Sequence, residues 1–287
     1  MIPSHTNKPN FFILGAGRSG TTYLWHLLRL HPEIFLTRIK EPTFFCKQFQ
    51  LVNNPIDYFE LYDAVSDEPI RGEASHAYLS DPTTARVLKA LFPDSKFVVI
   101  LRNPADRAYS LYHWMRRRGY EYIKTFERAL EAEEGRYNSI QFMEQCPHYF
   151  YNSLYFRSGL YGDQLKRYFK IFSRDRFHII KFEDFIVNRL KYTRDICRFL
   201  GIDSEFSPNL DAKTNSGNVT ARYPGIQYYV TNKLNRFRRT RKQCLKLLEK
   251  VNVTNVLPLS RETRERLLER YSSDLQDLFD MTGISFV

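Results

Sequence analysis

The residues best suited to do chemistry form a glycine-rich turn near the N-terminus, GAGRSGTT at positions 15–22. An apolar run, Phe11 to Leu14, precedes the turn, and a helical pattern begins at Thr21. Small residues allow close approach to the backbone, and the N–H groups at a helix start bind phosphate or sulfate. Arg18 adds the single positive charge of the turn. The stretch therefore predicts an anion-binding loop, although an ordinary strand-to-helix turn would have a similar pattern.

The glycine spacing of this turn, from Gly15 to Gly20, matches the phosphate loop of ATPases. That motif continues with a lysine, whereas Gly20 is followed by Thr21 and Thr22. The missing lysine argues against the terminal phosphates of ATP as the bound anion. A P-loop-type nucleotide kinase or NTPase remains an alternative, as does a non-catalytic module that binds polyanions.

A second cluster of polar residues lies in LRNPADRAYS, positions 101–110. Arg102 follows the apolar run KFVVIL, and Ser110 lies about two turns into the next helical pattern. A guanidinium and a hydroxyl in these places could bind one phosphate group together. An ATPase would instead place an acid at this strand end to hold Mg²⁺. Arg102 is equally consistent with a strand-end ion pair.

Strands and helices must alternate to position these clusters. We predict extended segments at residues 11–14, 34–36, 96–101 and 177–182, a short strand and turn at 72–79, and helices at about 21–30, 83–92, 105–118, 125–135, 150–172 in two pieces, 192–200, 228–250 and 261–282. Such alternation is typical of a parallel sheet with right-handed crossovers, in which ligands bind beyond the carboxyl ends of the strands. Arg18, Arg102 and Glu183 all follow strand ends. The prediction is a single α/β domain over 1–287, with its core at about 10–220 and a C-terminal helical appendix at about 228–282.

Composition sets the remaining bounds. The 287 residues carry a formal net charge of +11, which indicates an anionic partner or substrate without identifying it. Four cysteines lie far apart without a CxxC pair, which argues against a zinc site and favours a reducing compartment. Neither a signal peptide nor a long apolar run is found, so the expectation is a cytoplasmic protein without a transmembrane segment. No nucleic-acid partner is expected, and the oligomeric state is left open.

Together these segments resemble the sulfotransferases that use 3′-phosphoadenosine 5′-phosphosulfate, PAPS. GAGRSGTT is similar to their 5′-phosphosulfate loop, and RNPADRAYS (102–110) is similar to their 3′-phosphate segment. KEPTFF (40–45) resembles a segment of the heparan-sulfate-type and bacterial carbohydrate sulfotransferases. RSGLYGDQLKRYF (157–169) and FEDF (182–185) are similar to further segments of this group. The matches cover about residues 10–220 in the expected order.

The resemblance implies a P-loop-like phosphosulfate-binding loop, PAPS as co-substrate, adenosine 3′,5′-bisphosphate as product, and no metal. The residues that would hold the nucleotide are Gly17, Arg18, Ser19, Gly20, Thr21 and Thr22 at the 5′-phosphosulfate, Arg102 and Ser110 at the 3′-phosphate, Tyr161 near the nucleotide, and Asn215, Ser216 and Gly217 in a loop that closes over it. The acceptor would be a hydroxyl group, and KEPTFF favours a carbohydrate or glycolipid.

Catalysis would be an in-line displacement in which Glu41 takes the acceptor's proton and Arg18 meets the charge on the leaving phosphate. The alternative for Glu41 is a surface acid before a proline. His76 is the rival base, unless it is structural; it stands where relatives have a proline, and Ala74 stands where they have a lysine. The basic residues at 116–118 and 236–242 could attract an acidic glycan or a membrane surface, or form solvated helix faces.

Overall fold

The structure is a computed structural model that describes residues 7–207, 219–233 and 238–286. The chain forms two compact units. The first comprises Met1–Asn103, Leu160–Thr214 and Ser273–Val287, and the second comprises Pro104–Gly159 and Asn215–Ser272. The single domain predicted over 1–287 stays a prediction.

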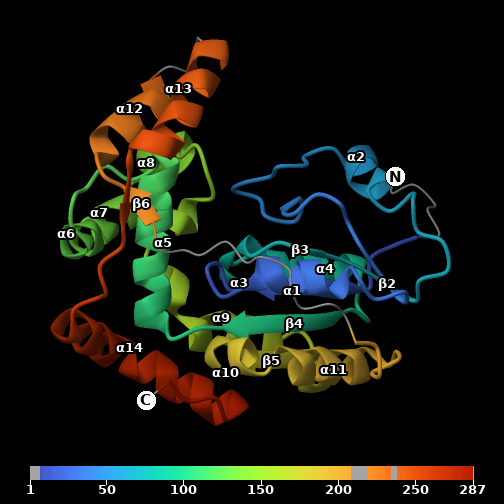
Figure 1. The fold of residues 1–287 in the computed structure, drawn as a ribbon. Helices are drawn as coiled ribbons and strands as arrows, with labels where there is room; N and C mark the ends of the chain where they lie inside the picture. Colours follow the sequence, from blue (N-terminus) through green and yellow to red (C-terminus); the bar gives the residue numbers. More distant parts are fainter. Residues whose placement is uncertain (1–6, 208–218, 234–237, 287) are drawn as a thin grey trace. The chain divides into compact units, whose positions relative to one another are not determined.

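The first unit is built on a five-stranded parallel sheet (Figure 1). Its strand order is β2 (Ile34–Leu36), β3 (Ile70–Ala74), β1 (Phe11–Gly15), β4 (Lys96–Leu101) and β5 (Phe177–Lys181). The predicted parallel α/β fold is thereby confirmed. Because β1 is the central strand, the loop that follows it has the carboxyl ends of β3 and β4 on either side, which is where ligands bind in such folds.

The alternation of side chains along the strands builds one core on each face of this sheet. On one face, Phe11 and Ile13 pack in a cluster with apolar residues of α1 (Thr21–Leu28) and α11 (Arg189–Leu200). On the other face, the Phe12 ring contacts the rings of Tyr78 and Phe97. Phe11, Phe12 and Ile13 of β1 are fully buried, and each contributes roughly 2–3 kcal/mol of hydrophobic stabilisation. The sheet edge that carries the functional loops is therefore rigidly held.

Short helices complete the first unit. They are α2 (Pro55–Glu60), α3 (Ala77–Ser80), α4 (Thr84–Leu91), α9 (Tyr161–Phe169), η3 (Arg174–Arg176), α10 (Phe182–Val187) and the end of α14 (Arg261–Thr282). Residues 46–69, for which no helix or strand was predicted, contain α2, whose N-terminus is capped by the Asn54 side chain. Of the short strand and turn predicted at 72–79, the strand is the end of β3, which stops at Ala74, and the rest leads into α3.

The second unit is mainly helical. It contains α5 (Pro104–Arg118), α6 (Phe126–Glu131), α7 (Glu133–Tyr137), α8 (Ile140–Gln145), η1 (Phe150–Ser153), η2 (Arg157–Gly159), β6 (Val219–Ala221), α12 (Pro224–Lys233), α13 (Arg238–Val251), β7 (Val253–Asn255) and the start of α14. β6 and β7 pair antiparallel. The single helix predicted at 228–250 is wrong, because two helices span this region. The C-terminal helix at 261–282 is confirmed, and the Ser260 hydroxyl accepts from the Thr263 N–H at 3.1 Å.

Candidate functional site

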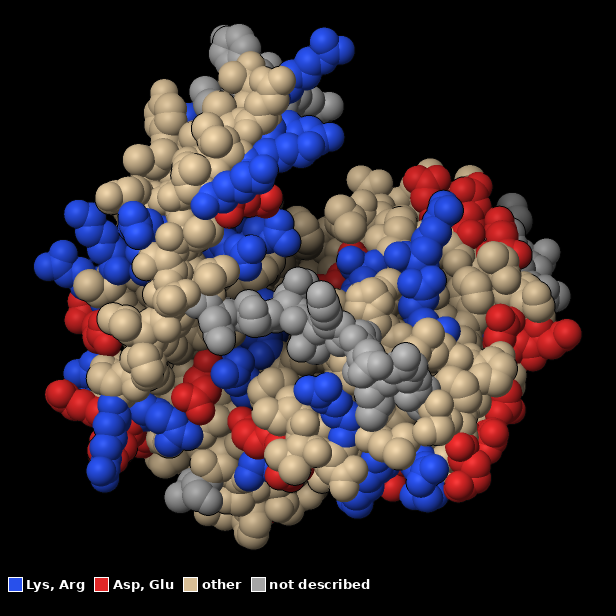
Figure 2. Space-filling model, in the orientation of Figure 1, with Lys and Arg blue, Asp and Glu red and all other residues tan. Residues whose placement is uncertain are grey.

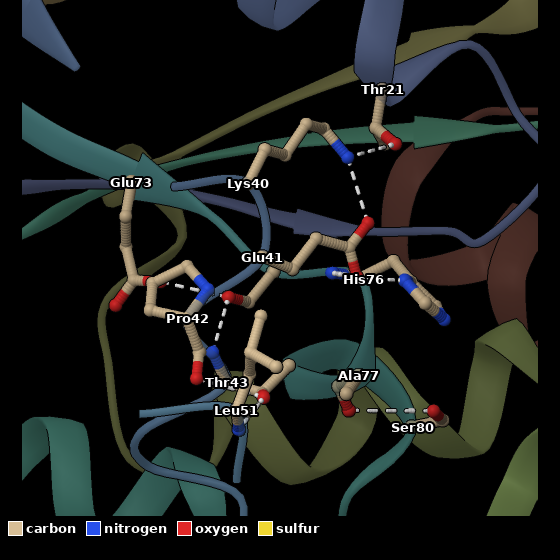
Figure 3. Close-up of polar contacts among 11 residues, drawn as sticks. Thr21, Lys40, Glu41, Pro42, Thr43, Leu51, Glu73, His76, Ala77 and Ser80 are labelled. Carbon is tan, nitrogen blue, oxygen red and sulfur yellow. Dashed lines mark hydrogen bonds and ion pairs between the residues drawn. The ribbon is translucent and has the colours of Figure 1, made fainter. Parts of the chain in front are cut away.

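Polar residues gather at the carboxyl edge of the sheet in the first unit, each delivered by the segment that follows one strand. They are Arg18 after β1, Lys40 and Glu41 after β2, His76 after β3, Arg102 after β4 and Glu183 after β5. Figure 3 shows that the Lys40, Glu41 and His76 side chains meet close to Thr21 at the start of α1. The parallel topology therefore unites segments that are far apart in sequence.

The glycine loop has the backbone shape of an anion cradle. Arg18 and Gly20 both have left-handed φ values, 70° and 86°, which turn the loop tightly into α1. The Ala16 N–H donates to the Ile100 carbonyl at 2.7 Å and so fixes the loop to β4. Ser19 is fully buried, and its hydroxyl has no hydrogen-bond partner among the described residues. Because a buried hydroxyl without a partner is costly, these features fit a bound phosphate or sulfate group.

Arg102 lies directly beside this loop. Its Nη1 donates to the carbonyl oxygen of Arg18 at 3.3 Å. Its guanidinium carbon lies 5.1 Å from the centroid of the Phe182 ring. The same ring packs against Gly20 of the loop, where a Cβ would lie 3.0 Å from a ring carbon. The Tyr161 hydroxyl donates to the Arg102 carbonyl at 3.0 Å. The structure thus brings Arg18, Arg102 and Tyr161 together, as expected of residues that bind one nucleotide.

Glu41 is held by donors on both of its carboxylate oxygens (Figure 3). Oε1 accepts from the Lys40 ammonium at 2.7 Å. Oε2 accepts from the backbone N–H of His76 at 3.3 Å and also contacts His76 Nδ1. The Lys40 ammonium in turn lies 3.5 Å from the Thr21 hydroxyl. The cluster therefore links the acid, the histidine and the start of α1.

Electrostatics favour the carboxylate form of Glu41. Burial by itself would raise the pKa of this carboxyl, but the charges and hydrogen bonds of His76 and Lys40 outweigh burial and hold the pKa well below its usual range. A carboxylate with so low a pKa is a weak proton acceptor. The predicted role of Glu41 as base stays a prediction.

His76 lies against the glycine loop as well as against Glu41. A Cβ built on Gly17 would come within 2.7 Å of His76 Cδ2 and 3.3 Å of Nε2. Such a short contact cannot exist, so position 17 must be glycine while the imidazole stays in this place. The pairing of Glu41 with His76 therefore forms directly beside the candidate anion cradle.

A buried network behind the site was not found by sequence reasoning. The Glu73 carboxylate accepts from the hydroxyls of Tyr58 and Tyr78, at 2.7 and 3.0 Å, and from Ser75 at 2.7 Å. Ser75 also accepts from the Thr43 N–H at 3.1 Å, which anchors the segment that carries Glu41. Burial raises the pKa of Glu73 to about 7, although the three hydroxyl donors lower it. Tyr58 gives no local sequence signal, because it lies on the unpredicted α2.

Other predicted residues have different outcomes. Ser110 is half-buried on α5 in the second unit, so its pairing with Arg102 at a 3′-phosphate stays a prediction. The Thr22 side chain is exposed. Asn215, Ser216 and Gly217 lie outside the described residues.

Lys40 lies in the candidate site but was not among the residues predicted from the sequence. Ala74, where related proteins were expected to have a lysine, is buried on β3, whereas the Lys40 ammonium reaches the site from the neighbouring segment. The position of Lys40 directly before Glu41 was the available signal. A lysine before an acid is too common for that signal to have identified it.

The described residues offer neither a metal-binding cluster nor a membrane-spanning helix. Within residues 7–207, 219–233 and 238–286, no three His, Cys, Asp or Glu side chains are grouped as a metal ion would require. In the same ranges, no helix combines the length and the apolar character needed to cross a bilayer.

Comparisons with known proteins agree on one family. The family model described as the sulfotransferase domain matches residues 8–241. A sulfotransferase crystal structure from Alicyclobacillus acidocaldarius is 28% identical and superposes with a TM-score of 0.75, covering 97% of each chain. Mouse carbohydrate sulfotransferase 15 is 28% identical over 272 residues, which cover 74% of this chain and 47% of that protein. The membrane-associated sulfotransferase kil1 of Dictyostelium discoideum is 33% identical over 117 residues, covering 38% of this chain and 24% of that protein. The chain thus spans less than half the length of these two relatives.

Proposed function

Because the chain belongs to the sulfotransferase domain family, we propose that it transfers a sulfuryl group from PAPS to a hydroxyl of a carbohydrate or glycolipid. The observation that carries this proposal is the direct contact between an anion cradle and a group of ionisable side chains. His76 lies on Gly17 of the cradle, and Lys40 joins Thr21 to Glu41. A donor bound in the cradle would present its reacting end to residues able to move a proton.

PAPS is proposed to bind through charge and backbone donors. Arg18, the Ser19 hydroxyl and the N–H groups at the start of α1 would hold the 5′-phosphosulfate, and Arg102 would hold the 3′-phosphate together with Ser110. Tyr161 supports Arg102 through its carbonyl oxygen. Two separate anion sites suit a nucleotide that carries both a 3′-phosphate and a 5′-phosphosulfate.

The transfer is proposed to be a single displacement. The acceptor oxygen forms a bond to sulfur while the bond from sulfur to the 5′-phosphate oxygen breaks. The electron pair of that bond leaves with adenosine 3′,5′-bisphosphate, and the hydroxyl proton passes to the Glu41–His76 pair. Arg18 and the helix N-terminus stabilise the charge that develops on the leaving phosphate. Positioning and electrostatics carry most of the catalysis, as in phosphoryl transfer.

The acceptor class is proposed from two observations. Carbohydrate sulfotransferase 15 and a human bifunctional heparan sulfate N-deacetylase/N-sulfotransferase are among the relatives, the latter 28% identical over 206 residues. In the second unit, basic side chains follow α13, where Figure 2 shows a row of Lys and Arg. Its exposed members are Arg239, Lys242, Lys246 and Lys250. A basic row of this kind suits an acidic glycan, and we propose that it attracts one.

The nucleotide proposal is tested by calorimetric titration with adenosine 3′,5′-bisphosphate. Arg18→Ala and Arg102→Ala should each weaken binding by about 2–4 kcal/mol, because each removes a charged donor to a phosphate or sulfate group. Arg86→Ala, an exposed arginine on α4, is the matched control and should bind like the wild type. Unchanged affinity in both site variants would overturn the assignment.

The same titration separates the alternatives. A P-loop-type kinase or NTPase would bind ATP with Mg²⁺ more tightly than the bisphosphate. A polyanion-binding module would bind the bisphosphate but transfer no sulfate to any acceptor. The absence of a lysine after Gly20 is the observation against the first alternative.

A further inference from the structure

We propose that the proton acceptor is Nε2 of His76, and that Glu41 is a positioning residue that holds the imidazole. This assignment rests on the proposed sulfuryl transfer. It gives the two members of the Glu41–His76 pair different roles in that reaction. It reverses the roles predicted from the sequence, in which Glu41 was the base and His76 its rival.

Both carboxylate oxygens of Glu41 already accept hydrogen bonds from protein donors. Oε1 accepts from the Lys40 ammonium, and Oε2 accepts from the His76 backbone N–H and meets Nδ1. An acceptor hydroxyl would have to compete with these donors for a carboxylate in a largely buried place, where its side chain is 20% exposed.

The contacts with Glu41 also set up the His76 imidazole as a proton acceptor. A carboxylate beside Nδ1 favours the tautomer with its proton on Nδ1, which leaves the lone pair on Nε2. The carboxylate also stabilises the imidazolium that forms when Nε2 takes a proton. This is the division of roles in a nucleophile–histidine–acid arrangement, with the acceptor hydroxyl in the place of the nucleophile.

The position of the His76 imidazole beside the anion cradle also suits a base. The imidazole ring is packed on Gly17 of the cradle, with Nε2 3.3 Å from the place of a Cβ on that residue. Glu41 contacts Nδ1 of the ring, and Lys40 pairs with that carboxylate; beyond α3, Arg167 of α9 donates to the Ser80 carbonyl. Glu41 is the group in direct contact with Nδ1, so it governs the proton on this ring.

The reaction then balances simply. The acceptor oxygen bonds to sulfur, its proton moves to Nε2, and the bisphosphate leaves with the electron pair of the broken bond. The imidazolium returns the proton to water in a later step. Lys40 keeps its bond to Glu41 throughout, so the carboxylate stays charged beside the imidazolium.

The test measures kcat/KM against pH for the wild type, His76→Ala and Glu41→Gln, with His26→Gln as an exposed histidine control. Turnover of the wild type should fall at acid pH, because a protonated imidazole cannot act as a base. His76→Ala should lose about 10²–10⁴-fold in turnover and lose this acid limb. Added imidazole should restore at least about tenfold of that loss. Glu41→Gln should keep the acid limb at a lower turnover, because the imidazole stays in place but loses the carboxylate that holds it.

The result that would overturn the proposal is a His76→Ala enzyme with near-normal turnover and the wild-type acid limb, while Glu41→Gln is inactive at every pH. A readout independent of activity is the ¹⁵N spectrum of the histidines in the protein without donor. His76 should carry its proton on Nδ1 in the wild type and lose that preference in Glu41→Gln. A proton on Nε2 in the wild type would contradict the assignment.

Failure of the proposed function has a different signature. A wild-type chain that neither binds adenosine 3′,5′-bisphosphate nor transfers sulfate would overturn sulfuryl transfer itself. Bisphosphate affinity within about threefold of the wild type in both variants shows that their site is intact, because neither side chain is proposed to hold the nucleotide.

Discussion

At the scale of single residues, glycine 17 and histidine 76 constrain each other. The imidazole occupies the space that a side chain at position 17 would need, so the loop can curve around an anion while the histidine lies on it. The contact between Gly17 and His76 could not be predicted from either residue alone. GAGRSGTT predicts a cradle, and GEASHAYL places a histidine near a strand end, but their contact depends on the pairing of β1 with β3.

Replacing Gly17 with alanine should displace His76, because the new Cβ would lie 2.7 Å from Cδ2. We expect turnover to fall about 10–100-fold, since small displacements of catalytic groups have effects of this size. The control is Gly135→Ala in α7, where a Cβ would meet nothing within 4 Å, and it should leave turnover unchanged. Equal turnover in the two variants would argue against contact between the loop and the imidazole.

Lys40 is predicted to support the fold as well as the site. Its ammonium is 8% exposed and pairs with Glu41, so Lys40→Met would leave a buried carboxylate with one cationic partner fewer. The free energy of unfolding should fall by about 1–3 kcal/mol in urea denaturation. The exposed Lys47→Met should stay within about 0.5 kcal/mol of the wild type. A Lys40 variant as stable as the Lys47 variant would show that this ion pair contributes nothing.

At the scale of elements, the strand ends and their backing network position the site. Glu73 on β3 receives three hydroxyl donors, and Ser75 carries that network to the Thr43 N–H in the segment after β2. Thr43 has a left-handed φ of 51°, which is unusual for a β-branched residue and is held in place by this anchoring. The segment that bears Lys40 and Glu41 is thus fixed from behind.

Glu73 should also make stability depend on pH. The pKa of its carboxyl is raised to about 7, above its unfolded value of 4.5, so the folded protein keeps a proton that the unfolded chain loses in this window. Stability from this group is therefore present at low pH and lost as pH rises to about 7. Relative to the wild type, Glu73→Gln should gain roughly 2–3 kcal/mol in unfolding free energy between pH 4.5 and 7.5. The exposed Glu60→Gln should show no such trend, and a pH-independent difference for Glu73→Gln would contradict the expectation.

The elements also show how far the sequence could be read. β1 and β4 were predictable because their apolar runs are buried on both faces, and the half-buried β5 because of its short apolar run. The anion loop followed from the glycines after β1. The path of the chain after β3 was not predictable, because helix α3 has four residues and no side chain caps its N-terminus. The contact of His76 with Glu41 was equally hidden, because it depends on the pairing of β2 with β3.

At the scale of the whole molecule, the positive net charge is the property that would act first on an approaching acceptor. The net charge of +11 and the basic row on α13 favour approach of an anionic acceptor. The four cysteines are free thiols, and the expected cytoplasmic location stays a prediction. Of the basic run predicted at 236–242, Arg239 and Lys242 are exposed, whereas Arg241 is half-buried, with its guanidinium 3.5 Å from the Thr231 carbonyl.

Charge reversal on α13 tests this whole-molecule role. The double variant Lys242→Glu, Lys246→Glu should raise KM for an acidic glycan about 3–10-fold at low salt, because it turns attraction into repulsion. The effect should shrink as salt is added, and KM for an uncharged sugar acceptor should not change. An equal change for both acceptors would indicate damage to the fold instead of lost steering.

The most direct measurement of the central claim is transfer of ³⁵S from labelled PAPS to a panel of glycans, glycolipids, phenols and steroids. We expect labelled product from a carbohydrate or glycolipid hydroxyl, formed in equal amount with adenosine 3′,5′-bisphosphate and without added metal. We also expect loss of that product in Arg18→Ala. No labelled product from any acceptor, with a protein that binds the bisphosphate, would contradict the proposed sulfuryl transfer.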